Sequence, residues 1–241
     1  MDGIKLGKVF GIEIWLHYTW FFIFLLVVTS YSFDILPRVL QQFSAISYLL
    51  IGLVITLLFF GSILFHELAH SLYARKKGLY VRRITLFIFG GAAEIESEPK
   101  KPVTEFVMAG VGPLASIALA VVFFSIALIG LVTGSVTLQV IGSTLAVTNF
   151  ILAIFNLIPG FPMDGGRMVR AALWKLTGNF QQATRIASFL GKVTAALIIV
   201  FGIIRVVMGV GIGGFWLILI GIFLFGAASA ANRERRLNPE V

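Results

Sequence analysis

The chain contains no cysteine, few charged residues and only three histidines among its 241 residues. The missing cysteine excludes disulfides, thiolate metal ligands and a cysteine nucleophile. Charged residues make up 12% of the chain and hydrophobic residues 59%, whereas a soluble domain carries about 25% and 45–50%. This composition excludes a water-soluble globule, a disordered chain and a disulfide-stabilised scaffold.

Long uncharged runs predict how the chain crosses a membrane, because a helical span needs about 20 apolar residues. We expect an all-α polytopic membrane protein with six transmembrane helices. The run 106–163 is long enough for two spans. Each of the other uncharged or nearly uncharged runs holds one span: 14–33, 39–66, about 183–209 and 206–232. Glycines mark the expected break inside the longest run, at Gly130, Gly134 and Gly142.

One segment, about 79–97, departs from the helical pattern. It is rich in β-branched and aromatic residues around Gly90-Gly91, which predicts a β-hairpin or small sheet on the cytoplasmic side. We expect the strands of this element to offer an edge that an extended substrate joins, so that proline at ladder positions within 84–88 would block cleavage while zinc stays bound. No repeat or second soluble domain is visible, so we expect a single membrane-embedded domain over 1–241 without an appended soluble regulatory domain.

The positive charges predict the orientation in the membrane. Sixteen of the 19 Lys and Arg residues lie in the termini and alternate connections, against one, Arg38, in the opposite connections. The positive-inside rule then places both termini on the cytoplasmic side of a multi-pass cell membrane. Topology and contact with anionic lipids of the bilayer account for the net charge of +8, so we expect no nucleic-acid partner.

The segment His66-Glu67-Leu68-Ala69-His70, at the end of the second expected span, predicts a metal site. Histidines at i and i+4 project from one helix face, close enough to supply two ligands of a metal tetrahedron. Glu67 lies beside the first ligand, where it can reach a metal-bound water without binding the metal. An acidic residue within an apolar helix is costly and usually functional.

Asp164 is the candidate third ligand. A catalytic zinc ion needs three protein ligands and one open position, and the chain offers no cysteine and only a distant His17. Asp164 lies in a bend rich in proline and glycine, and the span count places it on the same side of the membrane as His70. Its alternative role is to cap a helix over residues 165–176.

Two motifs together resemble the site-2 protease family of intramembrane zinc metalloproteases, especially its compact prokaryotic and archaeal six-helix members. They are His66-Glu67-Leu68-Ala69-His70 and Asn156-Leu-Ile-Pro-Gly-Phe-Pro-Met-Asp164-Gly165. The resemblance implies one zinc ion per chain, held by His66, His70 and Asp164. It further implies Glu67 as the catalytic general base and acid, and Asn156 and Asn149 as groups that hold the substrate backbone or the developing oxyanion.

Shorter segments resemble further motifs of this family. Phe89-Gly90-Gly91 is similar to the glycine pair of its β-element, and Gly112-Pro113 to its third-helix signature. Many relatives carry an appended nucleotide-sensing or peptide-binding domain, and this chain ends shortly after its last expected helix. Two interpretations of this difference stay open: regulation by partner proteins, or a sequence that is the truncated core of a longer protein.

The sequence therefore predicts an intramembrane zinc endopeptidase that cuts transmembrane or membrane-adjacent segments of a membrane-protein substrate. A zinc-activated water would attack the peptide bond, with Glu67 moving the proton, in a pocket that opens to the cytoplasm. A divalent-metal transporter and an inactive relative that binds membrane proteins are the alternatives. No inverted repeat supports transport.

Several polar residues have structural interpretations. Asn149 is as suited to a helix-packing hydrogen bond as to substrate contact. The cationic and aromatic residues of segment 165–176 are expected to anchor it at the membrane interface rather than to recognise a ligand; they are Arg167, Arg170 and Trp174.

Overall fold

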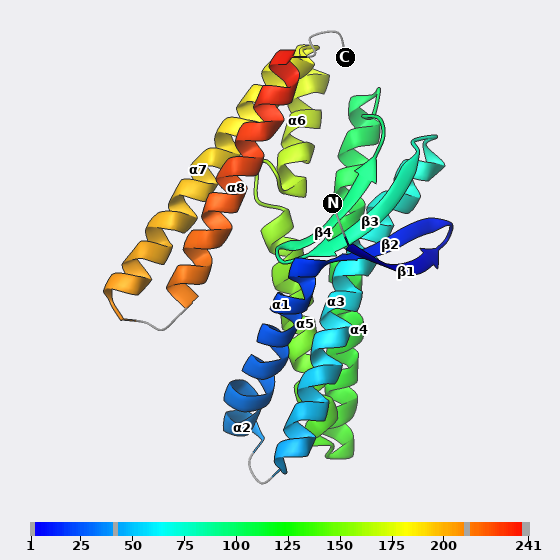
Figure 1. The fold of residues 1–241 in the computed structure, drawn as a ribbon. Helices are drawn as coiled ribbons and strands as arrows, with labels where there is room; N and C mark the ends of the chain where they lie inside the picture. The colour runs from blue at the N-terminus through cyan, green and yellow to red at the C-terminus, as the bar shows by residue number, and fades with distance from the viewer. Residues whose placement is uncertain (1–2, 41–42, 210–212, 238–241) are drawn as a thin grey trace. The chain divides into compact units, whose positions relative to one another are not determined.

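The computed structural model describes residues 3–40, 43–209 and 213–237, with side chains described as far as residue 231. Six helical segments are long and apolar enough to cross a membrane, judged by length and composition (Figure 1). They are Tyr18–Val39, Ala45–Lys76, Pro102–Thr133, Val136–Asn156, Phe180–Val207 and Gly213–Ala231. The prediction of a mainly helical, six-span protein is confirmed.

The first two spans begin and end elsewhere than the uncharged runs indicated. The first run started at residue 14, but the helices start at Tyr18, with α1 (Tyr18–Ser30), a π-helical turn η1 (Tyr31–Ile35) and α2 (Leu36–Val39). The second run ended at residue 66, whereas α3 covers Ala45–Lys76. Charge ends a hydrophobic run but does not end a helix, because Glu, Lys and Arg are good helix formers.

The break in the longest run lies at Gly134, where φ is +73°. It separates α4 (Pro102–Thr133) from α5 (Val136–Asn156). The predicted breaks at Gly130 and Gly142 are wrong, because both lie inside helices where α4 and α5 pack closely. A Cβ atom on Gly142 would lie 2.7 Å from the Phe123 carbonyl oxygen, so these glycines permit helix contact rather than a turn.

A four-stranded sheet holds the predicted β-element. Its order is β1-β2-β3-β4, with β2 and β3 parallel and the outer pairs antiparallel. The strands are β1 (Gly3–Val9), β2 (Ile12–His17), β3 (Val81–Phe87) and β4 (Gly90–Ile95). The expected hairpin over 79–97 is confirmed, but β1 and β2 were missed, although β2 alternates buried and half-buried residues as a strand should.

The sheet corrects the positions at which proline was expected to block substrate pairing, although the 79–97 element does include an edge strand, β4. Positions 84–87 belong to an interior strand that pairs with both β2 and β4. An interior strand has no free backbone groups to offer. Within the described sheet, the edges are β1 and β4.

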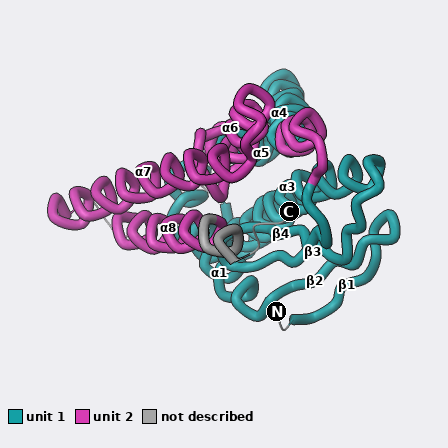
Figure 2. Tube along the Cα trace, turned by 90° about the horizontal axis from the view of Figure 1, so that it is seen from above, with its two compact units in different colours: residues 1–98, 111–153 teal, residues 99–110, 154–241 magenta. Residues whose placement is uncertain are grey.

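The chain divides into two compact units, residues 1–98 with 111–153 and residues 99–110 with 154–241 (Figure 2). The first has a core drawn from α2, α3, α4 and α5: Leu36, Leu40, Ile51, Ile55, Phe123, Leu145 and Ala146. The second contains α6 (Asp164–Thr177), α7 (Phe180–Val207) and α8 (Gly213–Leu237). The prediction of one membrane-embedded domain over 1–241 stays a prediction.

Arg170 on α6 is buried, so its expected role as an interfacial anchor is wrong. Only 5% of the residue is exposed, its Nε donates to Glu105 Oε1 over 2.6 Å, and its guanidinium stacks on the rings of Phe161 and Phe180. Burial lowers the pKa of Arg170, and the Glu105 carboxylate opposes that shift. Glu105 is 65 positions away along the chain, beyond the reach of helix-pattern reasoning.

Candidate metal centre

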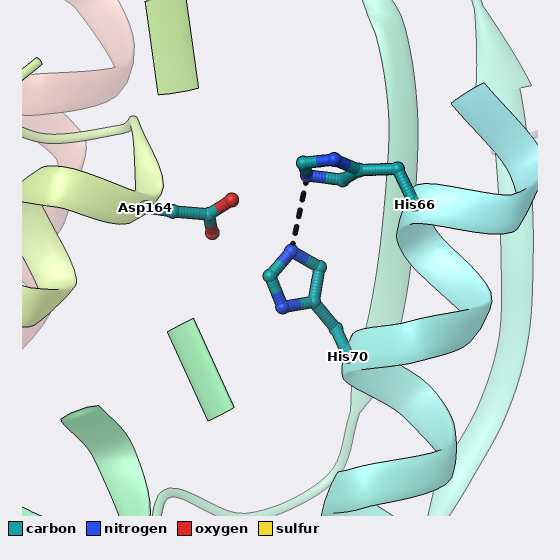
Figure 3. Close-up of side chains that lie close together, drawn as sticks. All are labelled: His66, His70 and Asp164. Atoms are coloured by element: carbon teal, nitrogen blue, oxygen red, sulfur yellow. Dashed lines mark hydrogen bonds between the residues drawn. The ribbon is translucent and has the colours of Figure 1, made fainter. Parts of the chain in front are cut away.

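His66 and His70 lie one turn apart within α3, and both are buried. Their Nε2 atoms face each other 3.1 Å apart, as the dashed line in Figure 3 shows. Two lone pairs this close repel unless a proton or a cation lies between them. Nitrogens bound to one tetrahedral zinc ion at about 2.0–2.1 Å lie about 3.3 Å apart, so the observed spacing suits the metal.

Ser116 on α4 orients the first of these histidines. Its Oγ lies 2.8 Å from His66 Nδ1, and both side chains are buried. When Nδ1 carries the proton and donates to Ser116, the lone pair at His66 Nε2 is left for a metal. Sequence reasoning missed Ser116. The available signal was the i, i+4 spacing of Ser116 from Gly112, which places the serine on the same helix face as the glycine of the third-helix motif.

Gly112 leaves the space between the histidines open. A Cβ atom at this position would lie 2.7 Å from His66 Nε2 and closer still to His70 Nε2. Any side chain at this position would occupy the volume in which a shared ligand atom or metal must lie. The third-helix glycine motif thus has a steric reason in this chain.

Glu67, half-buried on α3, lies against β4. A Cβ atom on Gly91 would lie 3.2 Å from the Glu67 Cδ and 3.4 Å from its Oε1. The missing side chain at Gly91 therefore makes room for the carboxylate that the sequence predicts as the catalytic base and acid.

Asp164 is the first residue of α6 and is 8% exposed. Met163 occupies the N-cap position and Asp164 the first helical position, so the alternative prediction of Asp164 as the N-cap is wrong. Backbone contacts hold the bend before it: Phe161 N donates to Ala187 O over 3.1 Å, and Gly166 N donates to Met163 O over 3.0 Å. These bonds hold the backbone from which the Asp164 side chain projects.

His66, His70 and Asp164 each offer a ligand atom, and these atoms all lie within 4.8 Å of one another (Figure 3). Two imidazoles with one carboxylate form a donor set that catalytic zinc sites use. All three residues are buried, which suits a site that holds a cation away from bulk water. The residues present therefore fit a zinc ion.

The two candidate asparagines differ in their surroundings. Asn149 is fully buried, and its Nδ2 donates to Ser62 Oγ over 3.1 Å and to Leu145 O over 2.8 Å. These bonds favour the helix-packing interpretation. Asn156 is half-buried and ends α5. The substrate or oxyanion role stays a prediction for both residues.

Comparison with known proteins places these motifs in a family. The model of peptidase family M50 matches residues 54–144 and 132–201. Proteins of Synechocystis sp. and Mycobacterium tuberculosis (Rip3) with zinc metalloprotease in their names are each 38% identical to the chain over 241 residues, covering 100% and 99% of it. A zinc metalloprotease of Methanocaldococcus jannaschii is 33% identical over 96% of the chain. The chain spans about three-fifths of the length of these curated relatives: 62%, 60% and 61%.

A solved structure shares the fold over nearly its whole length. The site-2 protease from Methanocaldococcus jannaschii aligns with a TM-score of 0.65 at 30% identity, covering 96% of this chain and 95% of that one. The chain belongs to peptidase family M50, the site-2 protease family. With its six apolar helices, it is a multi-pass membrane protein.

Proposed function

We propose that this chain is an intramembrane zinc endopeptidase in which His66, His70 and Asp164 hold one zinc ion. The observation that carries the proposal is the pair of buried Nε2 atoms 3.1 Å apart, with ligand atoms of all three residues within 4.8 Å of one another. The names of the M50 relatives support zinc as the metal. When bound, zinc supplies Lewis acidity to a peptide carbonyl and lowers the pKa of an attacking water.

Glu67 would move the proton in this reaction. Its carboxylate follows the first ligand on the same helix and lies in the space that Gly91 leaves open. A carboxylate oxygen of Glu67 accepts a proton from the attacking water and later donates it to the nitrogen of the leaving amine. The peptide C–N bond breaks, and one water is consumed.

The two asparagines are proposed to act differently, Asn156 directly on the substrate and Asn149 through the protein. Asn156 lies at the end of α5 and is partly accessible, so its amide can hold a substrate carbonyl or the oxyanion. Asn149 is fully buried and bonded to Ser62, one turn before His66 on α3. A contribution from Asn149 would therefore act through the position of α3.

The substrate proposed is a transmembrane or membrane-adjacent segment of another protein. A helical substrate hides its carbonyl groups in intrahelical hydrogen bonds, so it must unwind before cleavage and satisfy its backbone within the protein. The edge strand β4 contains Gly91, which adjoins Glu67. An extended substrate paired with β4 would run past the catalytic carboxylate. We further propose that both termini and the opening of the site face the cytoplasm, from the charge distribution.

The test uses the full chain purified with zinc and reconstituted in vesicles with labelled single-span membrane peptides. Glu67→Gln should retain about one zinc per chain and lose cleavage, whereas Asp164→Asn should lose both. Zinc content is measured by elemental analysis and cleavage by sequencing of the fragments. Cleavage by Glu67→Gln would contradict the role of Glu67. Zinc flux into vesicles without cleavage by the wild type would favour a transporter.

A further inference from the structure

The tip of the β1–β2 hairpin carries a residue that its backbone disfavours. Phe10 has a φ of 50° and is the one non-glycine residue with positive φ in the described part of the chain. Bulky residues are strained in this left-handed region, which suits glycine or asparagine. Phe10 is also 70% exposed, so its ring gains little from packing within the protein. Neither local preference nor burial explains a phenylalanine here.

Exposed apolar and basic side chains lie along the hairpin and at the end of α3. Three more apolar residues of β1 are exposed: Ile4, Leu6 and Val9. Five basic side chains lie on the hairpin or at the end of α3, namely Lys5, Lys8, Arg75, Lys76 and Lys77, and Glu13 is the acidic partner of Lys5 and Lys8. An exposed apolar tip with excess positive charge matches the chemistry of an anionic lipid surface.

The tip is tied to the end of a helix that is long enough to span a bilayer with its headgroups. Arg75 Nη1 donates to the Phe10 carbonyl oxygen, which ties the tip to the last turn of α3. α3 has 32 residues, or about 48 Å at 1.5 Å per residue, whereas a bilayer with its headgroups is about 40–45 Å thick. A helix of this length can reach from one headgroup layer to the other, and in that arrangement Arg75 and the tip lie at headgroup level.

We propose that the β1–β2 hairpin is a lipid anchor in which Phe10, Leu6 and Val9 enter the boundary between headgroups and acyl chains of an anionic leaflet. The basic side chains contact lipid phosphates, which reinforces insertion of the apolar tip. The anchor would hold the sheet at a fixed depth, including β4, where Gly91 adjoins Glu67. This inference is independent of the proposed proteolysis.

The absence of cysteine permits a direct depth measurement with a single label. The full chain carrying Phe10→Cys with a nitroxide is reconstituted in vesicles of phosphatidylcholine with phosphatidylglycerol. Collision rates with oxygen, which concentrates in lipid, and with a water-soluble nickel chelate are measured by electron paramagnetic resonance. Ser97→Cys, exposed outside the helices, is the aqueous reference, and Leu197→Cys, exposed midway along α7, is the lipid reference.

The label at position 10 should give reagent contacts between those at 97 and 197, with contact to the nickel chelate about tenfold below that at 97. Replacing Lys5 and Lys8 by Gln should raise this contact severalfold, because each cation near the surface contributes about 1 kcal/mol. Nickel contact equal to that at 97 would overturn the proposal. Low contact with both reagents would also overturn it, since a protein would then cover the tip. If contact of the label with the nickel chelate stays low both without the two lysines and in vesicles without phosphatidylglycerol, the proposed role of charge is refuted.

Discussion

The two halves of the proposed zinc site are built in different ways. His66 and His70 belong to one uninterrupted helix, and their separation follows from helical periodicity. Asp164 follows an irregular bend at the start of α6, where backbone contacts with α7 fix its position. The first half needs little beyond a helix and a vacant space beside it. The second half depends on tight packing within its own unit.

Glycine serves both halves, but for different purposes. Gly112 keeps the volume between the imidazoles free. Gly191 instead allows the backbone of α7 to pack closely on the backbone at Phe161, since a Cβ atom on Gly191 would lie 2.8 Å from Phe161 N. Side-chain packing also differs, because the second unit buries an ion pair between Arg170 and Glu105. We therefore expect changes around the histidines to affect zinc directly, and changes to the packing of the unit that carries Asp164 to affect folding first.

The largest effect is expected from Gly112→Ala. The added methyl group would lie between His66 Nε2 and His70 Nε2, so zinc affinity should fall by more than about 100-fold, beyond the loss of an outer hydrogen-bond partner. Gly110→Ala is the matched control, because a Cβ atom there meets only Met168 Cε at 4.0 Å. Zinc titration in detergent measures both. Equal affinities in the two variants would contradict the position of the metal.

Arg170→Met should act on folding. It leaves the Glu105 carboxylate buried without its cation, which costs about 3–5 kcal/mol of unfolding free energy. A second change, Glu105→Leu, should recover most of that loss, since a buried ion pair is often replaceable by apolar residues. Lys175→Met, on an exposed position of the same helix, is the control. Unfolding in mixed micelles gives the values, and an Arg170 variant as stable as the control would refute this account.

Ser116→Ala sharpens the description of the first half. Without the Oγ partner of His66 Nδ1, the imidazole loses its preferred tautomer and orientation, and zinc affinity should fall about 10-fold to 100-fold. Stability should change less than in the Arg170 variant. Ser125→Ala, exposed on the same helix, provides the matched control in the zinc titration. A Ser116 variant with wild-type affinity would remove Ser116 from the site.

The smallest effect concerns the sheet. The hydrogen bond from Arg83 lowers the pKa of Glu94 below its ordinary value of 4.5. Glu94 therefore stabilises the folded sheet above pH 4.5, and this contribution disappears as the pH falls through the lowered pKa. The pair is partly exposed, so its value is below about 1 kcal/mol. The rates of amide hydrogen exchange in β3 and β4 should differ between wild type and Glu94→Gln above pH 4.5, and should become equal once the pH falls below the lowered pKa of Glu94. A constant difference would exclude this linkage.

Sequence reasoning recovered the features that depend on local pattern. The six spans follow from hydrophobic length, and the His66–His70 pair follows from i, i+4 spacing. The β-element over 79–97 follows from its composition. What it missed depends on partners far away in the chain: β2 pairs with β3, 70 positions later, Ser116 reaches His66, and Arg170 reaches Glu105. Such contacts leave no periodic signal in the sequence. The apolar residues of β2 were therefore assigned to the start of the first span.

X-ray absorption at the zinc edge, on the purified full chain and on Asp164→Asn, tests most directly whether His66, His70 and Asp164 share one cation. In the wild type we expect two imidazole nitrogens and a carboxylate oxygen at about 2.0–2.2 Å from the zinc ion. In Asp164→Asn we expect the carboxylate contribution and most of the bound zinc to be lost. An unchanged spectrum and unchanged zinc content in Asp164→Asn would contradict it.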